Sequence, residues 1–400
     1  SKVPGRILDR KLVRTFRLDI RLVEEQFEMV QYVEKGRKPR WGYFPQEGHP
    51  QVVTRFEGTK ITPGFLQAIA YEVYVKNVTF GLLHQWLGDM GMTVSENTLR
   101  NWLKKGKGYL DGMVVELKRI ALEKDAVVNC DETWCKVRKY DRYKKCYMWV
   151  LVNKAERVVI FFYEDGSRGR EVLTNFLGDA ELKALMSDGY NAYVFIGDEL
   201  KSERYKDTDH QVCLAHVRAK FVKARMEGGD KRADVFLENI NRLFRFEREY
   251  DREMITDGER TRRRQGLPTL EAMINLRANL LQELKSEEEQ KSCYMREALN
   301  YLHKFWNEAF TYIKDGRYPI SNNLAERAVR PFTTKRKNSL HFGSDEGAEI
   351  AAVYHSIIST VKLQGRSAWD YLGKFFTGIF NGCRDFLSLT PQNIDLAVCQ

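Results

Sequence analysis

The feature that most constrains the fold is an alternation of apolar runs and amphipathic segments between residues 124 and 216. Three strand-length runs come first, in AVVNCDETWCKV, KCYMWVLVN and RVVIFFYED, with short polar segments between them. This pattern predicts a meander of three antiparallel strands. SRGREVLTNFLGD is amphipathic and predicts a helix, and LKALMSDGYNAY predicts a fourth strand that runs into a glycine turn.

A fifth strand and a helix are predicted in DHQVCLAHVRAKFVKA. Three antiparallel strands, a helix, a strand, a helix and a strand is the order found in RNase H-like proteins. The predicted fold class is therefore α/β, with an RNase H-like mixed sheet of five strands. The first and fourth strands are neighbours in such a sheet, so residues at their ends face one cleft.

The segments around this sheet differ in character. Residues 1–60 hold short β-branched and aromatic runs, including RTFRLDIRL and QVVTRFEG, and predict a small β-rich module. Residues 61–120 predict a helical DNA-binding region, in which Ser95 caps a helix with Leu99, Trp102 and Leu103 on one face. A helix, a glycine turn and a helix with a basic outer face is helix-turn-helix spacing. Two packed helices without a DNA contact are the alternative.

The remaining expected units follow in chain order. The first part of the catalytic core covers 121–216, a helical insertion domain covers 217–316, the second part of the core covers 317–365, and a C-terminal helical tail covers 366–400. The basic residues near 260–264 are placed in a polar connector within the insertion. Pro331 is expected to disturb the helix that carries Glu326.

The net charge of +10 points to a polyanionic partner. Basic residues cluster at 6–21, 136–145, 218–225, 260–264 and 335–337. A solvated basic surface is the alternative explanation of charge alone.

The chain has no apolar stretch near the roughly 20 residues that span a bilayer, and its first residues lack a signal-peptide core. Seven scattered cysteines indicate reduced thiols, so a cytoplasmic, nucleoid-associated location is expected.

Three carboxylates stand out by context. Asp131 sits at the polar end of one predicted strand, Asp188 ends another just before Gly189, and Glu326 lies on a helix that starts at an Asn pair. Each one alone is as well explained by a cap or a salt bridge. Together they favour Mg²⁺, which prefers hard oxygen ligands, and two such ions about 4 Å apart catalyse phosphodiester displacement. Glu132 points to the other strand face and is left out of this site.

The segment NNLAERAVRPFTTKRKNSLHFGSDEGAEIAAVYHSIISTVKLQG resembles the end of the catalytic domain in insertion sequence 66 family transposases. CDETWCKV resembles the first catalytic strand of that family, SDGYNAY the second, and CLAHVRAKF its Cys-x-x-His-x-Arg step. The resemblance covers about residues 60–375, in order. Two departures are the absence of a cysteine-rich zinc segment from residues 30–60 and Ser321 in place of an Asp before the Asn pair.

The resemblance implies a DDE transposase whose catalytic and metal-binding residues are Asp131, Asp188 and Glu326. It implies two Mg²⁺ ions, replaceable by Mn²⁺, hydrolysis at the ends of the element, and attack of the freed 3′-hydroxyl on target DNA. The expected partners are the terminal inverted repeats, target DNA, a second copy of the chain in a homodimer or higher oligomer, and small accessory proteins. No zinc is expected, because the Cys213 and His216 pair has no second pair beside it.

The residues expected to contact DNA are basic or polar and flank the expected site or the helical region. They are Arg100, Lys104, Lys105, His216, Arg218, Asn323, Arg327, Arg330, Lys335, Arg336 and Lys337. A solvated basic face is the alternative for the cluster near Glu326. Asn322 and Asn323 are expected mainly to cap the helix, and orienting Glu326 or touching DNA is the alternative. Trp134, Trp149 and Tyr190 are expected in the core or at its rim.

Two other functions compete with an active transposase. An RNase H-like nuclease or resolvase would share the metal site and lack strand transfer. A transposon-derived DNA-binding protein would have lost a carboxylate, whereas all three are present here.

Overall fold

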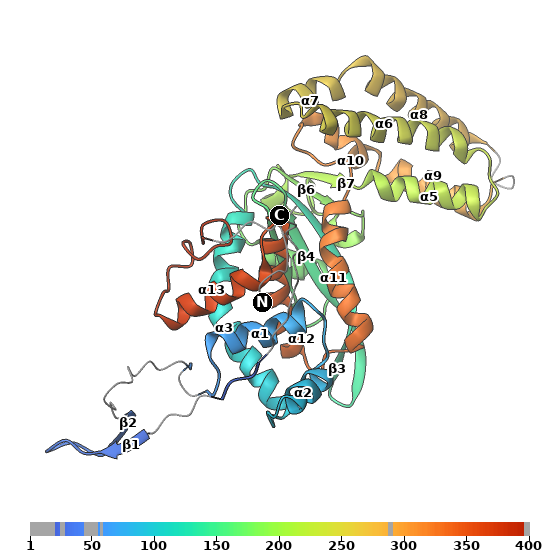
Figure 1. Cartoon of the computed structure of the whole chain (residues 1–400). Coiled ribbons are helices and arrows are strands. Elements are labelled where there is room, and N and C mark those ends of the chain that lie inside the picture. The colour runs from blue at the N-terminus through green and yellow to red at the C-terminus, as the bar shows by residue number, and fades with distance from the viewer. Residues whose placement is uncertain (1–20, 25–28, 44–54, 57–58, 287–290, 396–400) are drawn as a thin grey trace, which may run out of the picture.

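A five-stranded mixed sheet lies at the centre of the chain (Figure 1). The computed structural model describes residues 21–24, 29–43, 55–56, 59–286 and 291–395. The strands are β3 (Val127–Lys139), β4 (Arg142–Asn153), β5 (Val158–Phe162), β6 (Ala184–Ser187) and β7 (Asp209–Val212), in the order β5-β4-β3-β6-β7. β3, β4 and β5 pair antiparallel, whereas β6 and β7 run parallel to β3. The α/β class and the adjacency of the first and fourth strands of this sheet are confirmed.

The connections in the sheet differ at one point from the expected order. The predicted helix after the meander is α4 (Arg170–Leu177). Between β6 and β7, however, the chain forms two short 3₁₀ turns, η1 (Asn191–Tyr193) and η2 (Glu203–Tyr205), where the expected order has a helix. The glycine turn after the fourth strand is confirmed, because Gly189 has a φ of +81°, a conformation that costs glycine little.

The edge strand β5 is covered by α12 (Asp345–Leu363). The Thr360 hydroxyl accepts a hydrogen bond from the Val159 amide at 3.0 Å and donates one to the Val159 carbonyl. The Ser356 hydroxyl accepts from the Phe161 amide at 2.8 Å. These hydroxyls satisfy backbone groups that an open edge would expose to another strand. The helix α13 (Ala368–Phe380) follows within the expected C-terminal helical tail.

The N-terminal helices are α1 (Pro63–Tyr74), α2 (Phe80–Asp89) and α3 (Glu96–Ala121). Ser95 caps α3 as predicted, since its hydroxyl accepts from the Thr98 amide at 3.2 Å. Leu99, Trp102 and Leu103 are buried together. These helices share one hydrophobic cluster with the sheet, α12 and α13. The region 61–120 therefore packs as part of the main core, and its DNA-binding role stays a prediction.

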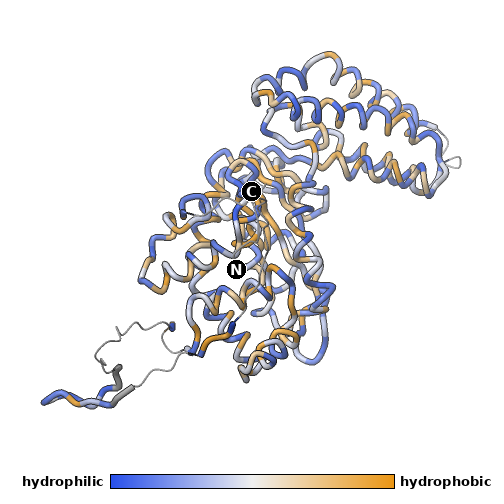
Figure 2. Tube along the Cα trace, viewed as in Figure 1, coloured by the Kyte–Doolittle hydropathy of each residue, from blue (hydrophilic) through white to orange (hydrophobic). Residues whose placement is uncertain are grey.

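The predicted helical insertion is confirmed as helical. It contains α5 (Leu214–Met226), α6 (Ala233–Glu253), α7 (Asp257–Arg264), α8 (Leu267–Lys285), α9 (Cys293–Lys304), α10 (Trp306–Phe310) and the 3₁₀ turn η4 (Thr311–Lys314). Most of these helices form a bundle that projects from the sheet (Figure 1), and it has a hydrophobic cluster of its own. Hydrophilic and hydrophobic residues alternate along the bundle helices (Figure 2), as expected for amphipathic segments.

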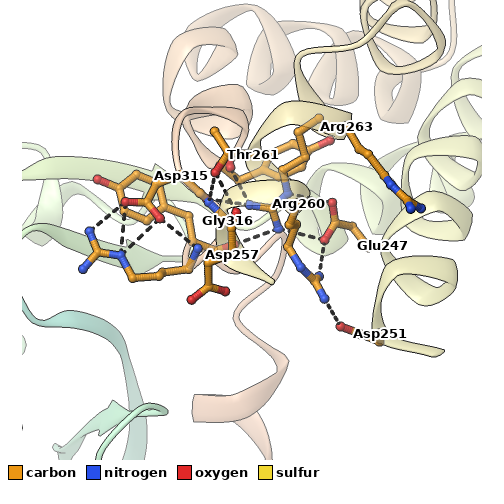
Figure 3. A network of polar contacts seen from close by, with 12 residues as sticks. Glu247, Asp251, Asp257, Arg260, Thr261, Arg263, Asp315 and Gly316 are labelled. Carbon is orange, nitrogen blue, oxygen red and sulfur yellow. Dashed lines mark hydrogen bonds and ion pairs between the residues drawn. The ribbon is translucent and has the colours of Figure 1, made fainter. Parts of the chain in front are cut away.

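The polar connector predicted near 260–264 is wrong, because these residues form helix α7. Arg264 is buried and donates to both carboxylate oxygens of Glu247, at 2.8 and 2.7 Å. It also donates to the carbonyls of Tyr312, Asp315 and Tyr318. Figure 3 shows the surrounding network, in which ion pairs join α6 to α7 and hydrogen bonds join α7 to the segment that returns to the sheet. These arginines tie the bundle together and are not a free basic patch.

Residues 1–60 are described in part. Strands β1 (Met29–Tyr32) and β2 (Arg40–Tyr43) form an antiparallel hairpin. The predicted runs at 14–22 and 51–58 lie largely outside the described residues. None of the helices in the described part of the chain is both long enough and apolar enough to cross a membrane.

Candidate functional site

The register of the sheet brings Asp131 and Asp188 to the same edge. Val127 on β3 pairs with Ala184 on β6, 57 positions later, and Asn129 pairs with Met186 in the same parallel register. Asp131 and Asp188 are also 57 positions apart, so Asp188 follows the end of β6 at the level of Asp131. Both carboxylates come from neighbouring strands, as the sequence predicted.

Glu326 comes from a third element, helix α11 (Asn323–Ser339), where it lies in the first turn. Asn322 holds the start of this helix against β3. Its side-chain amide donates to the Cys130 carbonyl at 2.8 Å and accepts from the Asn129 side chain at 2.9 Å. Its backbone amide donates to the Cys213 thiol at 3.1 Å. The start of α11 is therefore held at two points. One is Cys130 on β3, one residue before Asp131, and the other is Cys213, directly after the end of β7.

This arrangement corrects the capping role expected for Asn322. Asn322 is the N-cap residue of α11, but its side chain makes no capping hydrogen bond because it is engaged with β3. The helix also continues past Pro331, which lies inside it and was expected to disturb it. Packing against β3 and β4 compensates for the donor that Pro331 lacks.

The electrostatics of Asp131 show that the charges of both other predicted site carboxylates act on it. Burial raises the pKa of Asp131 to about 8, and the charges of Glu132, Asp188 and Glu326 add to the effect. No cationic side chain among the described residues forms an ion pair with Asp131 or Asp188.

Glu132 lies on the opposite face of the strand. It pairs with Trp149, whereas Asp131 pairs with Val150, and directly opposed residues of an antiparallel pair share a face. Its carboxylate accepts from Arg168 at 2.6 Å and from the Tyr193 hydroxyl at 2.6 Å. Burial raises the pKa of Glu132, while these two partners oppose the rise. Glu132 is thus a compensated structural acid.

The turn that carries Asp188 is held by a residue from the helical bundle. The Tyr301 hydroxyl, on α9, donates to the Asp188 carbonyl, and the Tyr190 amide donates to the Asp188 carboxylate at 2.9 Å. A side chain at Gly189 would clash with the Tyr301 hydroxyl. Nothing in the local sequence pattern pointed to Tyr301, because its contact spans 113 positions.

His216 lies beside Glu326, with 3.7 Å between its Nδ1 atom and the Glu326 carboxylate. This Nδ1 atom is buried and has no hydrogen-bond partner among the described residues. The Cys213 thiol completes a group in which one ligand atom from each residue lies within 4.8 Å of the others. The sequence offered only Cys213 and His216, and the fold adds Glu326. The expected absence of zinc stays a prediction.

One face of α11 carries exposed cations beside Glu326. Arg327, Arg330 and Lys337 are exposed, and within the described part of the chain no acidic side chain pairs with them. Their spacing of three and seven residues, together with exposed Asn323, puts them on one side of the helix. These four expected DNA contacts are accessible, and their role stays a prediction.

Lys335 was expected to contact DNA, and this prediction is wrong. Its side chain is buried, donates to the Val73 carbonyl at 2.6 Å and lies 4.1 Å from the centre of the Tyr74 ring. Burial lowers the pKa of Lys335 to about 7. Arg336, its neighbour, donates to the Thr133 hydroxyl and the Trp134 carbonyl, so it braces α11 against β3.

The other expected DNA contacts already have protein partners. Arg100 pairs with Glu96 and Lys104 with Glu346, each at 2.5 Å, and Arg218 donates to the Asn241 side chain at 2.6 Å. Lys105 is half-buried on α3. Of the aromatic residues, Trp149 is fully buried, while Trp134 and Tyr190 lie at the rim.

Comparison with known proteins places the chain in a family. The uncharacterized proteins y4jD and y4qI of Sinorhizobium fredii (strain NBRC 101917 / NGR234) are 26% and 25% identical to it. The y4jD alignment covers 73% of this chain and 57% of that protein, and the y4qI alignment covers 95% and 71%. The chain thus spans little more than half the length of y4jD. The sequence model described as transposase IS66 family matches residues 58–350, most of the chain. The chain belongs to the transposase IS66 family.

Proposed function

We propose that this chain is a DNA transposase with an RNase H-like core that cleaves phosphodiester bonds with two divalent metal ions. The observation that carries the proposal is that the charges of Asp188, just after β6, and of Glu326, in the first turn of α11, both act on Asp131 of β3, although the three residues are far apart in sequence. The strand order β5-β4-β3-β6-β7, with three antiparallel and two parallel strands, supports the RNase H-like assignment.

The donor set fits Mg²⁺. All three side chains offer carboxylate oxygens, which Mg²⁺ prefers, and Asp131 and Asp188 have no cation partner among the described residues. Asp131, Asp188 and Glu326 would hold the ions, and Mn²⁺ is expected to substitute. When bound, the ions activate the attacking oxygen and stabilise the leaving oxygen of an in-line displacement.

The protein's own contribution is to position these ligands. Asn322 ties Glu326 to the strand that carries Asp131, and Tyr301 holds the turn that carries Asp188. Arg168 and Tyr193 occupy the Glu132 carboxylate on the other face of β3, so Glu132 is not counted among the metal ligands. The exposed face of α11 with Arg327 and Arg330 would hold the phosphates of the scissile strand next to Glu326.

Cleavage at the ends of an element and transfer of the 3′-hydroxyl to target DNA are proposed as the reaction sequence. Both element ends must be held together for transfer, so a dimer or higher oligomer is proposed as the active form. The alternative is a nuclease with the same metal site and no strand transfer. A purely DNA-binding role is less well supported, because no carboxylate has been lost.

A strand-transfer assay tests the proposal. Labelled duplexes that end in the element's terminal repeats are incubated with the protein, Mg²⁺ and a target plasmid, and joined products are separated on a gel. Joined product is expected with Mg²⁺ or Mn²⁺ and none with EDTA. Asp188→Asn should abolish cleavage and leave DNA binding largely intact. Near-normal turnover by that variant would refute the metal site, and cleavage without joining would favour the nuclease.

A further inference from the structure

The strands β3 and β4 extend beyond the sheet as a two-stranded ribbon. β6 pairs with β3 only as far as Asn129, and β5 pairs with β4 only from Trp149 onward. Residues 134–147, here called the ribbon, therefore pair mainly with each other. A bridge between Val137 and Phe342 covers part of its outer edge. The ribbon lies beside α11 and starts three residues after Asp131.

Charge in the ribbon is strongly unbalanced. It contains six basic residues and one acidic residue, Asp141. Lys139 is anchored to the core by Asp165 and Asp345, at 2.5 and 2.8 Å. The other five basic residues are exposed and form no ion pair with any described side chain. They are Lys136, Arg138, Arg142, Lys144 and Lys145.

Two of these lysines lie directly opposite each other. Lys136 pairs with Lys145 across the strands, and like charges in this position destabilise a sheet. No carboxylate within the described residues relieves the repulsion. A polyanion would relieve it, because phosphates placed over the pair would replace the missing counter-charge.

Exposed aromatic rings share the ribbon with these cations. Trp134 and Tyr143 are 39% and 51% exposed, and Tyr140 at the tip is 96% exposed. Arg336 lies over one face of the Trp134 ring and His341 lies beside the Tyr143 ring, so each ring has one side left for a base. Tyr140 also has a φ of +57°, which is strained for a residue with a bulky side chain. The register places Trp134, Lys136, Arg138, Tyr143 and Lys145 on one face. Successive side chains of this face are about 6.8 Å apart along each strand.

We propose that this face of the ribbon binds a DNA strand whose bases are unpaired. Alternating cations and exposed rings bind single strands, because the cations follow the phosphates and the rings stack on bases. In a duplex the bases already stack on each other, so exposed rings gain little from it. Lys136 lies five residues beyond Asp131, about 17 Å along the strand. The identity of the bound segment rests on the proposed function: it is the unpaired DNA that flanks the cleaved phosphodiester.

Fluorescence anisotropy with labelled DNA and EDTA tests the proposal on the full chain. The probes are a 20-nucleotide single strand and the matching duplex. Lys136→Glu with Lys145→Glu should weaken single-strand binding at least tenfold and reduce the slope of log affinity against log salt by about 1.4. Lys154→Glu with Arg157→Glu is the matched control, since both are exposed cations at the β4–β5 turn. The control should bind the single strand like the wild type.

The ring contribution is tested separately. Tyr143→Ala should weaken single-strand binding about tenfold and leave duplex binding unchanged, whereas Tyr143→Phe should bind normally. An equal weakening of duplex and single-strand binding would overturn the assignment to unpaired bases. Wild-type affinity of the Lys136 and Lys145 double variant, with the fold checked by circular dichroism, would overturn the surface itself. Asp131→Asn should still bind, so a failure of the metal site is distinguishable from a failure of the ribbon.

Discussion

Acidic side chains are concentrated in two regions of this molecule. In one region they form ion pairs with arginines, and in the other region Asp131 and Asp188 form none with any described residue. In the bundle, Glu247 accepts from Arg264 at 2.8 and 2.7 Å and from Arg260 at 2.8 Å (Figure 3). Where the pairing of β3 with β6 ends, Asp131 and Asp188 lie at the same level of the sheet, and neither forms an ion pair with any described residue. A buried acid with its cation is a structural element, whereas a buried acid without one takes up a proton or binds a cation from solution.

The basic residues divide in the same way. All four arginines of α7 pair with acids of α6 or α7. Arg327, Arg330 and the five exposed cations of the ribbon face solvent without such partners among the described residues. Sequence clusters of arginine at 260–264 and of lysine and arginine at 136–145 look alike. Only the second cluster keeps exposed cations that no described acidic side chain neutralises. Pairing with a neighbouring acid therefore distinguishes cations that stabilise the fold from cations that can bind a ligand.

The largest expected effect comes from the uncompensated acids. Asp131→Asn should reduce Mg²⁺-dependent nicking of a terminal-repeat duplex by at least about 1000-fold, because it removes a charged ligand for the ions. Asp251→Asn, in the compensated region, is the control and should nick like the wild type. Comparable nicking by both variants would erase the distinction between the two regions.

The next effect concerns the stability of the bundle. Arg264→Leu should lower the free energy of unfolding by about 3–5 kcal/mol, because Glu247 and three carbonyls would be deprived of a buried donor. Combining it with Glu247→Leu should restore part of that stability. Arg262→Leu, which removes an exposed ion pair, should melt near the wild-type temperature. Thermal unfolding followed by circular dichroism measures all three, and an unaffected Arg264→Leu variant would contradict the structural role.

The effect of pH on the metal-free protein follows from Asp131. Burial, then Glu132 and Asp188, raises its pKa to about 8, above the value of about 3.9 in an unfolded chain. The folded state therefore holds this proton more tightly, and its stability should fall as pH rises from about 4 to about 8. The melting temperature in EDTA should drop by a few degrees over this range.

Two comparisons isolate this contribution. Asp131→Asn should flatten the pH dependence in EDTA, and Asp251→Asn should leave it unchanged. Adding Mg²⁺ at pH 8 should raise the melting temperature of the wild type more than that of Asp131→Asn. An equal response of both proteins to Mg²⁺ would argue against binding at this site.

The smallest expected effect concerns the cations of α11. Replacing Arg327 and Arg330 with Gln should reduce the salt slope of duplex binding by about two, because each neutralised phosphate contributes about one to that slope. Lys335→Met should leave the slope unchanged, because that side chain is buried against Val73 and Tyr74. A reduced slope for Lys335→Met, or an unchanged slope for the arginine variant, would reverse the assignment.

Much of the fold followed from local pattern. The three-strand meander, the fourth and fifth strands, the helices of the insertion and the Ser95 cap were all predictable, because periodicity and capping depend on near neighbours. The 3₁₀ turns between β6 and β7 and the helical continuation through Pro331 were not. Both depend on packing against distant segments, which outweighs local preference.

The sequence suggested the three carboxylates of the proposed site. It did not suggest the residues that hold them in place. Asp131, Asp188 and Glu326 stood out at strand ends and beside an Asn pair. The Asn322 bridge to Cys130 and the Tyr301 contact to Asp188 span 192 and 113 positions, and no local pattern encodes such contacts. Lys335 was misjudged for the same reason, since its burial depends on α1, 262 positions away.

The sequence alone determined the secondary structure, the chemistry of the three carboxylates and the number of positive charges. The tertiary structure decided which of those charges are neutralised. This division has a simple physical cause: hydrogen-bonding periodicity is a property of adjacent residues, whereas the energy of a charge depends on its distance from other charges and on its burial. Folding sets both quantities, and among the described residues it left Asp131 and the exposed ribbon cations without ion-pair partners while pairing the arginines of α7.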